Sequence, residues 1–367
     1  MNILILSCHT GEGHNSAAKA VGEELSALNH KYEIVDPSLI GGNKTKSLPS
    51  ICYNTLIKKK PSLFGVVYKA GKWYDSTKLV SPIYLVNATH AKAVWKYIED
   101  NKFDAAVCTH LFGMETLTAI RKRLGKYIPS YGILTDYTVV PFFCDAKIDG
   151  YFIPHEELKP SLAMRGIPDE KIFPTGIPVS PKFHSKMTKE EARIHLGMPK
   201  DKRIFVIMCG GIGGGNVIGL CEKMLSKVGN DALIYVLTGR NNKLRESVIE
   251  CFEGNSNIIV QPFTTEANVF MKAADVLLSK PGGLSSTEAA VSGVPLIHIG
   301  AIPGCETDNT KFFEKHGLSI AADDISDAAE KAVQLESDKL ISERMRAAQS
   351  SVINPYAARD IALKITQ

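Results

Sequence analysis

Three glycine-rich turns are the parts of this sequence best suited to hold a charged ligand. Each follows a short apolar run and precedes a helical pattern; they contain Gly11 and Gly13, residues 210–215, and Gly282 with Gly283. Glycine allows a sharp turn and a close approach of ligand to backbone. A helix N-terminus adds free N–H groups and partial positive charge, which suit a phosphate. The turns therefore predict phosphate-binding loops, and tight turns without a ligand are the alternative.

The first turn is close to a dinucleotide fingerprint but departs from it. Asp36 ends the second apolar run, where a ribose-binding acid is expected, yet Ser16 replaces the third glycine and His14 occupies the helix start. NAD binding is therefore the weaker reading. The second turn lacks the lysine of a P-loop, and no DxD sequence lies near either later turn. The pattern indicates neither ATP hydrolysis nor a divalent metal.

Strand and helix patterns alternate along the chain and position these turns. Strands are expected at 2–7, 32–36, 105–109, 131–135, 203–208, 233–237, 257–261, 275–279 and 294–299. This alternation predicts parallel sheets with ligands at the strand carboxyl ends. A proline-rich segment divides the pattern, so we predict an α/β chain of two Rossmann-like domains facing across a cleft. The expected parts are domains at 1–175 and 184–350, a hinge at 176–183, and a C-terminal helix within 351–367 that could return to the first domain.

Composition and charge restrict the class of protein. Of 367 residues, 44% are hydrophobic and 22% charged, as in globular proteins. Apolar runs have strand length, and the start lacks the features of a signal peptide, so we expect neither a transmembrane span nor a leader. The eight cysteines are scattered without a CxxC pair, which favours a reducing cytoplasm over a disulfide scaffold or zinc site.

One segment makes the chain basic. Residues 44–78 contain eight lysines and a single acid, Asp75, so the segment carries +7 and the remainder −3 of the net +4. Within residues 55–74 the lysines alternate with apolar and aromatic side chains, which fits an anionic membrane surface. A solvated loop is the alternative. The segment contains no arginine, which argues against nucleic-acid binding.

The order of several motifs resembles one enzyme family. They are TGEGHNSAA (10–18), TDYTVVPFF (135–143), FIPHEEL (152–158), GIPVSPKF (176–183), GGIGGGN (210–216), KPGGLSSTEA (280–289) and PGCETDN (303–309). The chain thereby resembles the monogalactosyldiacylglycerol synthase-like glycosyltransferases, including the processive diacylglycerol glucosyltransferases. The resemblance implies the GT-B fold, the family 28-like architecture, and an inverting transfer from a UDP-sugar to a hydroxyl without metal or other cofactor.

The resemblance also implies which residues act. His14 is expected to be the base or a polar group of the acceptor site, because imidazole titrates near neutral pH; a histidine that only caps its helix is the alternative. Asp136, after a predicted strand, is the rival base. Glu288 suits the ribose hydroxyls, as an acid does in dinucleotide folds. The expected donor-site residues are Gly211, Gly213, Phe263, Gly282, Gly283, Ser285, Ser286, Glu288, Glu306 and Asn309. The expected acceptor or membrane residues are Gly13, Lys58, Lys59, Lys60, Phe64 and Trp73.

We therefore expect a cytoplasmic enzyme, peripherally bound to the inner face of the cell membrane, that moves a hexose from a UDP-sugar to a lipid acceptor such as diacylglycerol. Transfer of N-acetylglucosamine to a lipid-linked peptidoglycan precursor is the second enzymatic reading. A non-catalytic protein that binds nucleotide sugars or NAD is the alternative from another class. The sequence names neither the sugar nor the oligomeric state.

The lysine segment leads to a first test. Replacing Lys58, Lys59 and Lys60 with glutamate should weaken binding to anionic vesicles by roughly a hundredfold at low salt, at about 1 kcal/mol per lost lysine. Added salt should weaken the wild-type protein in the same direction. Co-sedimentation with anionic and neutral vesicles measures both effects. Equal binding of the two proteins to anionic vesicles would exclude this segment as the membrane contact.

Overall fold

The computed structural model describes residues 1–8, 12–40, 68, 70, 71, 73–75, 77, 81–208, 216–229 and 231–367. Some residues singled out by the sequence lie outside these described residues, namely Gly211, Gly213, Lys58, Lys59, Lys60 and Phe64. Contacts divide the chain into two compact units. The first comprises Met1–Pro181, Ile302–Cys305 and Pro355–Gln367, and the second comprises Lys182–Ala301 and Glu306–Asn354.

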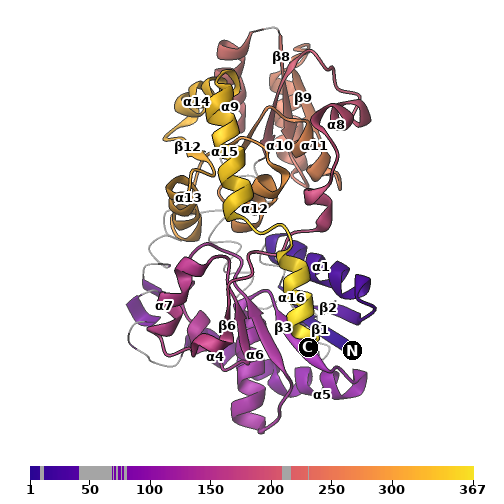
Figure 1. Cartoon of the computed structure of the whole chain (residues 1–367), viewed down its shortest axis with the longest axis vertical. Helices are drawn as coiled ribbons and strands as arrows, with labels where there is room; N and C mark the ends of the chain where they lie inside the picture. Colours follow the sequence, from indigo (N-terminus) through magenta and orange to yellow (C-terminus); the bar gives the residue numbers. More distant parts are fainter. Residues whose placement is uncertain are drawn as a thin grey trace. The chain divides into compact units, whose positions relative to one another are not determined.

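The first unit contains a sheet of six parallel strands in the order β2-β1-β3-β4-β5-β6 (Figure 1). The strands are β1 (Asn2–Leu6), β2 (Lys31–Val35), β3 (Ala105–Cys108), β4 (Ser130–Ile133), β5 (Gly150–Phe152) and β6 (Ile172–Phe173). The helices are α1 (Glu12–Ala27), α4 (Pro82–Asn87), α5 (Ala91–Asn101), α6 (Leu111–Ala119), α7 (Lys159–Ala163) and α16 (Ala357–Ile365). Ile3 of β1 lies opposite Tyr32 of β2 and Ala105 of β3, which sets the register.

Helices cover both faces of this sheet, because its strands carry apolar residues on both sides. Successive side chains on a strand point to opposite faces. Ile5 packs in the cluster that contains Val21 of α1. Leu6 packs in a second cluster with Val94 of α5 and Met114 of α6. A parallel sheet buried in this way reads as continuous apolar runs, as the strands of this unit do.

The end of the chain belongs to the first unit. Helix α16 packs against α1, and Figure 1 shows it in yellow beside the indigo helix. Ile361 and Ile365 join the apolar cluster that contains Val21 and Leu25. The chain therefore returns to the first sheet after it has completed the second unit.

The second unit contains another sheet of six parallel strands, in the order β12-β11-β10-β7-β8-β9. The strands are β7 (Arg203–Met208), β8 (Ala232–Leu237), β9 (Ile258–Gln261), β10 (Val276–Ser279), β11 (Leu296–His298) and β12 (Ile320–Ala321). The helices are α8 (Lys189–His195), α9 (Val217–Val228), α10 (Asn242–Cys251), α11 (Ala267–Ala273), α12 (Gly283–Ser292), α13 (Cys305–Lys315), α14 (Ile325–Ser337) and α15 (Lys339–Val352). The two parallel sheets confirm the predicted pair of Rossmann-like domains.

A buried guanidinium holds the amino ends of the two central strands of the second sheet. Arg193 is 6% exposed and donates through Nη2 to Asp275 Oδ2 at 2.8 Å. The same carboxylate oxygen accepts from the backbone N–H of Ile204 at 2.6 Å. Asp275 precedes β10 and Ile204 lies in β7, so one ion pair connects both strands to α8. Arg193 also donates to the carbonyl oxygens of Ala273, Lys200 and Lys202.

In each sheet, the strands that follow one another along the chain are first added on one side of the first strand and later on its other side. In the first sheet, β1 pairs with β2 on one side and β3 on the other. In the second, β7 pairs with β8 on one side and β10 on the other. At this switch point the connections that follow the two adjacent strands lie on opposite faces of the sheet. A crevice therefore opens at the carboxyl ends of the two strands, where ligands bind in folds of this kind. Within the part of the chain that the structure describes, no helix is long and apolar enough to cross a membrane.

The ion pair of Arg193 leads to a stability test. Replacing Arg193 with methionine should lower the free energy of unfolding of the second unit by about 3 kcal/mol, because it removes the ion pair with the partly buried Asp275 and the bonds to three carbonyl oxygens. Lys200→Ala is a matched control, since it breaks an exposed ion pair with Glu190 and should cost less than about 1 kcal/mol. Urea unfolding measures both. A methionine variant as stable as the control would contradict the role given to this pair.

Candidate functional site

The carboxyl edge of the first sheet brings together polar side chains from three neighbouring strands. His14 lies in the first turn of α1, which follows β1. Thr109 and His110 come directly after β3, and Thr135 comes shortly after β4. Because β3 lies between β1 and β4, these four residues meet at the point where the sheet changes direction. We call them the histidine cluster.

The hydrogen bonds of His14 determine which ring nitrogen carries its proton. Nδ1 lies 2.7 Å from the carbonyl oxygen of Thr109 and 3.2 Å from Thr135 Oγ1. A carbonyl oxygen only accepts, so Nδ1 carries the hydrogen and Nε2 of the neutral ring keeps its lone pair. Burial lowers the pKa of His14, against the opposing effect of the Thr109 bond. The ring is therefore neutral at physiological pH and can accept a proton at Nε2.

His110 is a member of the cluster that the sequence reasoning missed. Its ring lies perpendicular to that of His14, with the centroids 4.6 Å apart. Nδ1 of His110 accepts from the backbone N–H of Phe112 at 3.2 Å, which caps α6. Burial and the neighbouring His14 hold the pKa of His110 well below its usual value. The available signal was its position directly after a predicted strand, at the same sheet edge as His14.

Asp136 follows Thr135 in a loop whose far end is held by an ion pair. Phe142 adopts a left-handed backbone conformation with φ of 67°, which is unusual for a bulky residue. Its N–H donates to Asp75 Oδ1 at 3.1 Å, and Asp75 forms an ion pair with Arg165. This buried carboxylate thus holds the end of the loop that carries Asp136, which is itself half-buried.

Two other residues expected on the acceptor side lie apart from these hydrogen bonds. Gly13 is half-buried in the first turn of α1, next to His14. The side chain of Trp73 is 71% exposed, which is a large apolar surface in water. An indole of this kind suits a membrane–water interface better than a protein core.

In the second unit, α12 begins directly after β10 at the other switch point. Gly282 occupies the N-cap position, and no side chain among the described residues caps the helix. A Cβ at Gly282 would lie 3.1 Å from Ser285 Oγ, so glycine relieves crowding there. The hydroxyl of Ser285 donates to the carbonyl of Gly282 at 3.3 Å. The first amides of the helix are therefore free of a side-chain cap and suited to an anion.

Ser286 faces the protein interior. It is fully buried, and its hydroxyl lies 2.9 Å from Nε2 of His298 at the end of β11. Nδ1 of His298 lies 3.0 Å from the hydroxyl of Ser319. Burial lowers the pKa of His298 to about 3, so the ring stays neutral. These bonds anchor the first turn of α12 to the sheet beneath it.

Helix α13 is tied to the glycine turn that precedes α12. Asn309 is fully buried and donates through Nδ2 to the carbonyl oxygen of Pro281 at 2.9 Å. Glu306 lies in the first turn of the same helix and is half-buried. The side chain of Asn309 thus fixes the position of α13, and with it Glu306, relative to the turn.

An exposed ring and a guanidinium stack at the carboxyl ends of β8 and β9. Phe263 follows β9 and its side chain is 53% exposed. The guanidinium carbon of Arg240, which follows β8, lies 4.7 Å from the centroid of the Phe263 ring. Such a pair presents flat surfaces on which a planar base can stack. Arg240 did not figure in the sequence analysis.

Glu288 lies in the second turn of α12 and is half-buried. Burial raises the pKa of its carboxyl group to about 8, and the ammonium of Lys182 opposes this shift only in part. The carboxyl group is therefore mainly protonated at neutral pH in the free protein. Any ligand that hydrogen-bonds to its carboxylate form would also promote loss of that proton.

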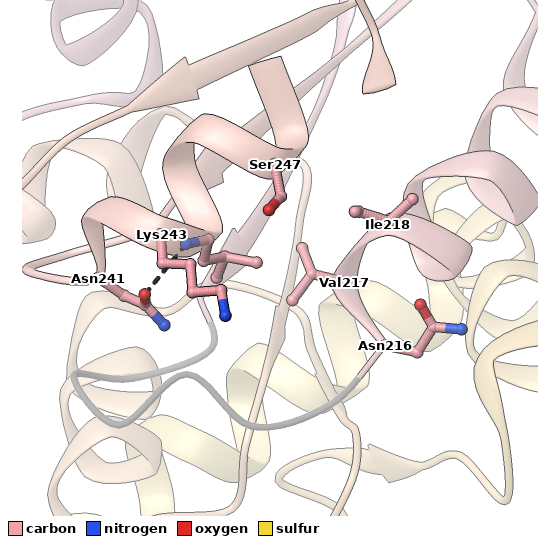
Figure 2. Close-up of a pocket in the computed structure, with 7 residues that line it drawn as sticks. Asn216, Val217, Ile218, Asn241, Lys243 and Ser247 are labelled. Atoms are coloured by element: carbon pink, nitrogen blue, oxygen red, sulfur yellow. Dashed lines mark hydrogen bonds between the residues drawn. The ribbon is translucent and has the colours of Figure 1, made fainter. Parts of the chain in front are cut away.

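A small pocket lies between the starts of α9 and α10, and Figure 2 shows its residues. Its volume is about 270 Å³, and it is lined by Asn216, Val217, Ile218, Asn241, Lys243, Leu244 and Ser247. Its two asparagines are helix caps, because Asn216 Oδ1 accepts from Gly219 N at 2.8 Å and Asn241 Oδ1 from Leu244 N at 3.0 Å. One amide at each of these helix starts is thus bonded to a side-chain cap, whereas no side chain among the described residues caps α12.

Known proteins resemble both halves of the chain. A family model described as monogalactosyldiacylglycerol (MGDG) synthase matches residues 14–179, and one described as glycosyltransferase family 28 C-terminal domain matches residues 205–362. A processive diacylglycerol beta-glucosyltransferase of Bacillus licheniformis is 28% identical over 343 residues, spanning 92% of this chain and 87% of that protein.

Solved structures show the fold. MurG of Acinetobacter baumannii has a TM-score of 0.64 at 14% identity, with 100% of this chain and 99% of that chain covered. MnaA of S. aureus, solved with UDP, has a TM-score of 0.66 at 13% identity, with 100% and 95% covered. Together with the two parallel sheets, these similarities confirm the expected GT-B fold.

The raised pKa of Glu288 leads to a test of stability against pH. Free glutamate titrates near pH 4.3, so between there and about pH 8 the folded chain holds a proton that the unfolded chain has released. Stability should therefore fall as pH rises across this window, and Glu288→Gln should remove that slope. Urea unfolding from about pH 5 to about pH 8 should show that the free energy of unfolding of Glu288→Gln increases relative to that of the wild type as pH rises.

Glu343→Gln is the control, because this side chain is exposed on α15 and its stability curve should stay parallel to that of the wild type. Parallel curves for Glu288→Gln and the wild type would contradict the protonated state of Glu288.

Proposed function

The chain belongs to the monogalactosyldiacylglycerol synthase-like glycosyltransferases and is a hexosyltransferase, and from this premise we propose that it transfers a hexose from a UDP-sugar to diacylglycerol, with inversion and without a metal. The observation that carries the proposal is the bond of His14 Nδ1 to the Thr109 carbonyl. It leaves a neutral ring with an available Nε2 at the switch point of the first sheet.

His14 acts as the base in this proposal. The acceptor oxygen attacks the anomeric carbon of the sugar, and its hydroxyl proton passes to His14 Nε2. The bond between the anomeric carbon and the diphosphate oxygen breaks, and its electron pair leaves with UDP. Attack opposite to the leaving group inverts the anomeric centre. A base placed in this way contributes about 100- to 10,000-fold to the rate.

The second unit supplies the donor site. The uncapped amides of α12 receive the diphosphate, and the helix dipole stabilises the charge that develops on it. Glu288 receives the ribose hydroxyls, while Phe263 and Arg240 face the base. Ser285 and Glu306 lie beside the diphosphate and the sugar, while Ser286 and Asn309 hold α12 and the glycine turn in place. A fixed helix dipole supplies the electrostatic stabilisation that a cation gives in other enzymes.

The acceptor and its membrane are part of the same proposal. The relative from Bacillus licheniformis is named for action on diacylglycerol, a lipid that resides in bilayers. The lysine segment and the exposed Trp73 support a peripheral attachment to the anionic inner face of the cell membrane. Transfer of N-acetylglucosamine to a lipid-linked peptidoglycan precursor is the competing outcome.

A donor panel tests the proposal. UDP-glucose, UDP-galactose and UDP-N-acetylglucosamine are supplied with vesicles that contain diacylglycerol, and products are identified by mass spectrometry with and without EDTA. We expect glycosyl-diacylglycerol from a UDP-hexose, with no loss of activity in EDTA. Product formed only on a peptidoglycan precursor lipid would replace the acceptor, and strong inhibition by EDTA would contradict the metal-independent mechanism.

The base is tested in the same assay. His14→Ala should lower turnover by about 100-fold or more and leave UDP affinity nearly unchanged, because the donor residues belong to the second unit. The acid limb of the wild-type rate profile should fall below the usual histidine pKa, where the buried ring becomes protonated. If Asp136→Asn abolishes turnover alone while His14→Ala abolishes UDP binding, Asp136 is the better base. Calorimetry with UDP measures the binding.

A further inference from the structure

His110 has a proton position that its backbone contact fixes. Its Nδ1 lies 3.2 Å from the N–H of Phe112, and an N–H group can only donate. Nδ1 must therefore be the unprotonated nitrogen. Because burial and His14 keep the pKa of His110 well below its usual value, the ring is neutral and its single proton resides on Nε2.

His14 has the opposite arrangement. Its Nδ1 donates to the Thr109 carbonyl at 2.7 Å, so its Nε2 carries a lone pair. The two rings are perpendicular and their centroids lie 4.6 Å apart. Both are only partly buried. One edge of the sheet therefore carries a hydrogen-bond acceptor and a hydrogen-bond donor side by side, each fixed by a backbone group of the segment that follows β3.

We propose that His110 is an acceptor-binding residue whose Nε2–H donates to a second oxygen of the acceptor while His14 takes the proton of the reacting hydroxyl. The proposal rests on the proposed function and adds a specificity element to it. The site selects a hydroxyl whose neighbouring carbon bears an oxygen-containing group that can accept a hydrogen bond, such as an ester. A 1,2-diacylglycerol has this arrangement, and a simple long-chain alcohol lacks it.

The hydrogen bond from His110 also assists the reaction. A hydrogen bond from His110 positions the acceptor molecule so that its hydroxyl meets His14 Nε2, which limits the orientations that the bound lipid can adopt. The proton of His110 remains on Nε2 throughout, because the other ring nitrogen, Nδ1, already accepts the N–H of Phe112. His110 thus binds and orients the acceptor, and His14 alone exchanges a proton.

Two substitutions separate this role from helix capping. Asparagine places its side-chain oxygen near the position of histidine Nδ1, so His110→Asn keeps the cap on Phe112 and loses the distal donor. Glutamine places its amide near the position of Nε2, so His110→Gln keeps the distal donor and loses the cap. If His110 binds the acceptor, the asparagine variant should be the impaired enzyme; if it only caps α6, the glutamine variant should be.

The experiment measures kcat/KM for 1,2-diacylglycerol and for a fatty alcohol in the same vesicles. We expect His110→Asn to lose about tenfold on diacylglycerol and little on the fatty alcohol, because one hydrogen bond is lost with the first acceptor only. His110→Gln should retain most of the wild-type preference. UDP affinity and thermal unfolding of both variants verify that donor site and fold are intact.

The role of His110 and the proposed function can fail separately, and the experiment distinguishes the two failures. Wild-type transfer to diacylglycerol with an unchanged His110→Asn enzyme would overturn the role of His110 and leave the proposed function standing. A wild-type enzyme that glycosylates no lipid would overturn both. NMR of isotope-labelled histidine gives a readout besides activity: we expect the ring proton of His110 on Nε2, and a proton on Nδ1 would overturn the inference.

Discussion

The pairing of strands at the two switch points is the constraint on which both sites depend. β1 lies between β2 and β3, and β7 lies between β8 and β10, so chain connections leave each central pair in opposite directions. The carboxyl ends of these pairs are therefore open to a ligand. His14 and Thr109 meet at one such end, and the amides of α12 emerge at the other. The ion pair of Arg193 with Asp275 holds β7 and β10 at their amino ends, away from the ligand edge.

Burial acts on both sites in the same direction, towards uncharged side chains. It lowers the pKa of His14 and His110 and raises that of Glu288 to about 8. The free protein thus presents two neutral imidazoles in one unit and a mainly protonated carboxyl group in the other. In the free protein the start of α12 therefore combines uncapped amides with a mainly protonated Glu288, an arrangement that suits an anion.

The sequence predicted the sheet edges at which the candidate site residues lie, because apolar runs indicate buried strands and glycine turns indicate where those strands end. It missed β5, β6 and β12, which are three residues or fewer; β11 is equally short but lies within the longer apolar run 294–299. It also missed His110 and Arg240, because only the fold brings them to His14 and Phe263. The inward direction of Ser286 depends on His298, which no local pattern reveals.

Proton positions show why side-chain identity alone does not define such a site. His14 and His110 are chemically the same residue, yet one must donate through Nδ1 and the other must accept there, since their backbone partners are a carbonyl and an N–H. Thr109 directly follows β3, and Phe112 lies in the first turn of α6. The chain from the end of β3 into the first turn of α6 therefore sets the proton positions of both histidines, and a change in its backbone would alter both even with each histidine in place.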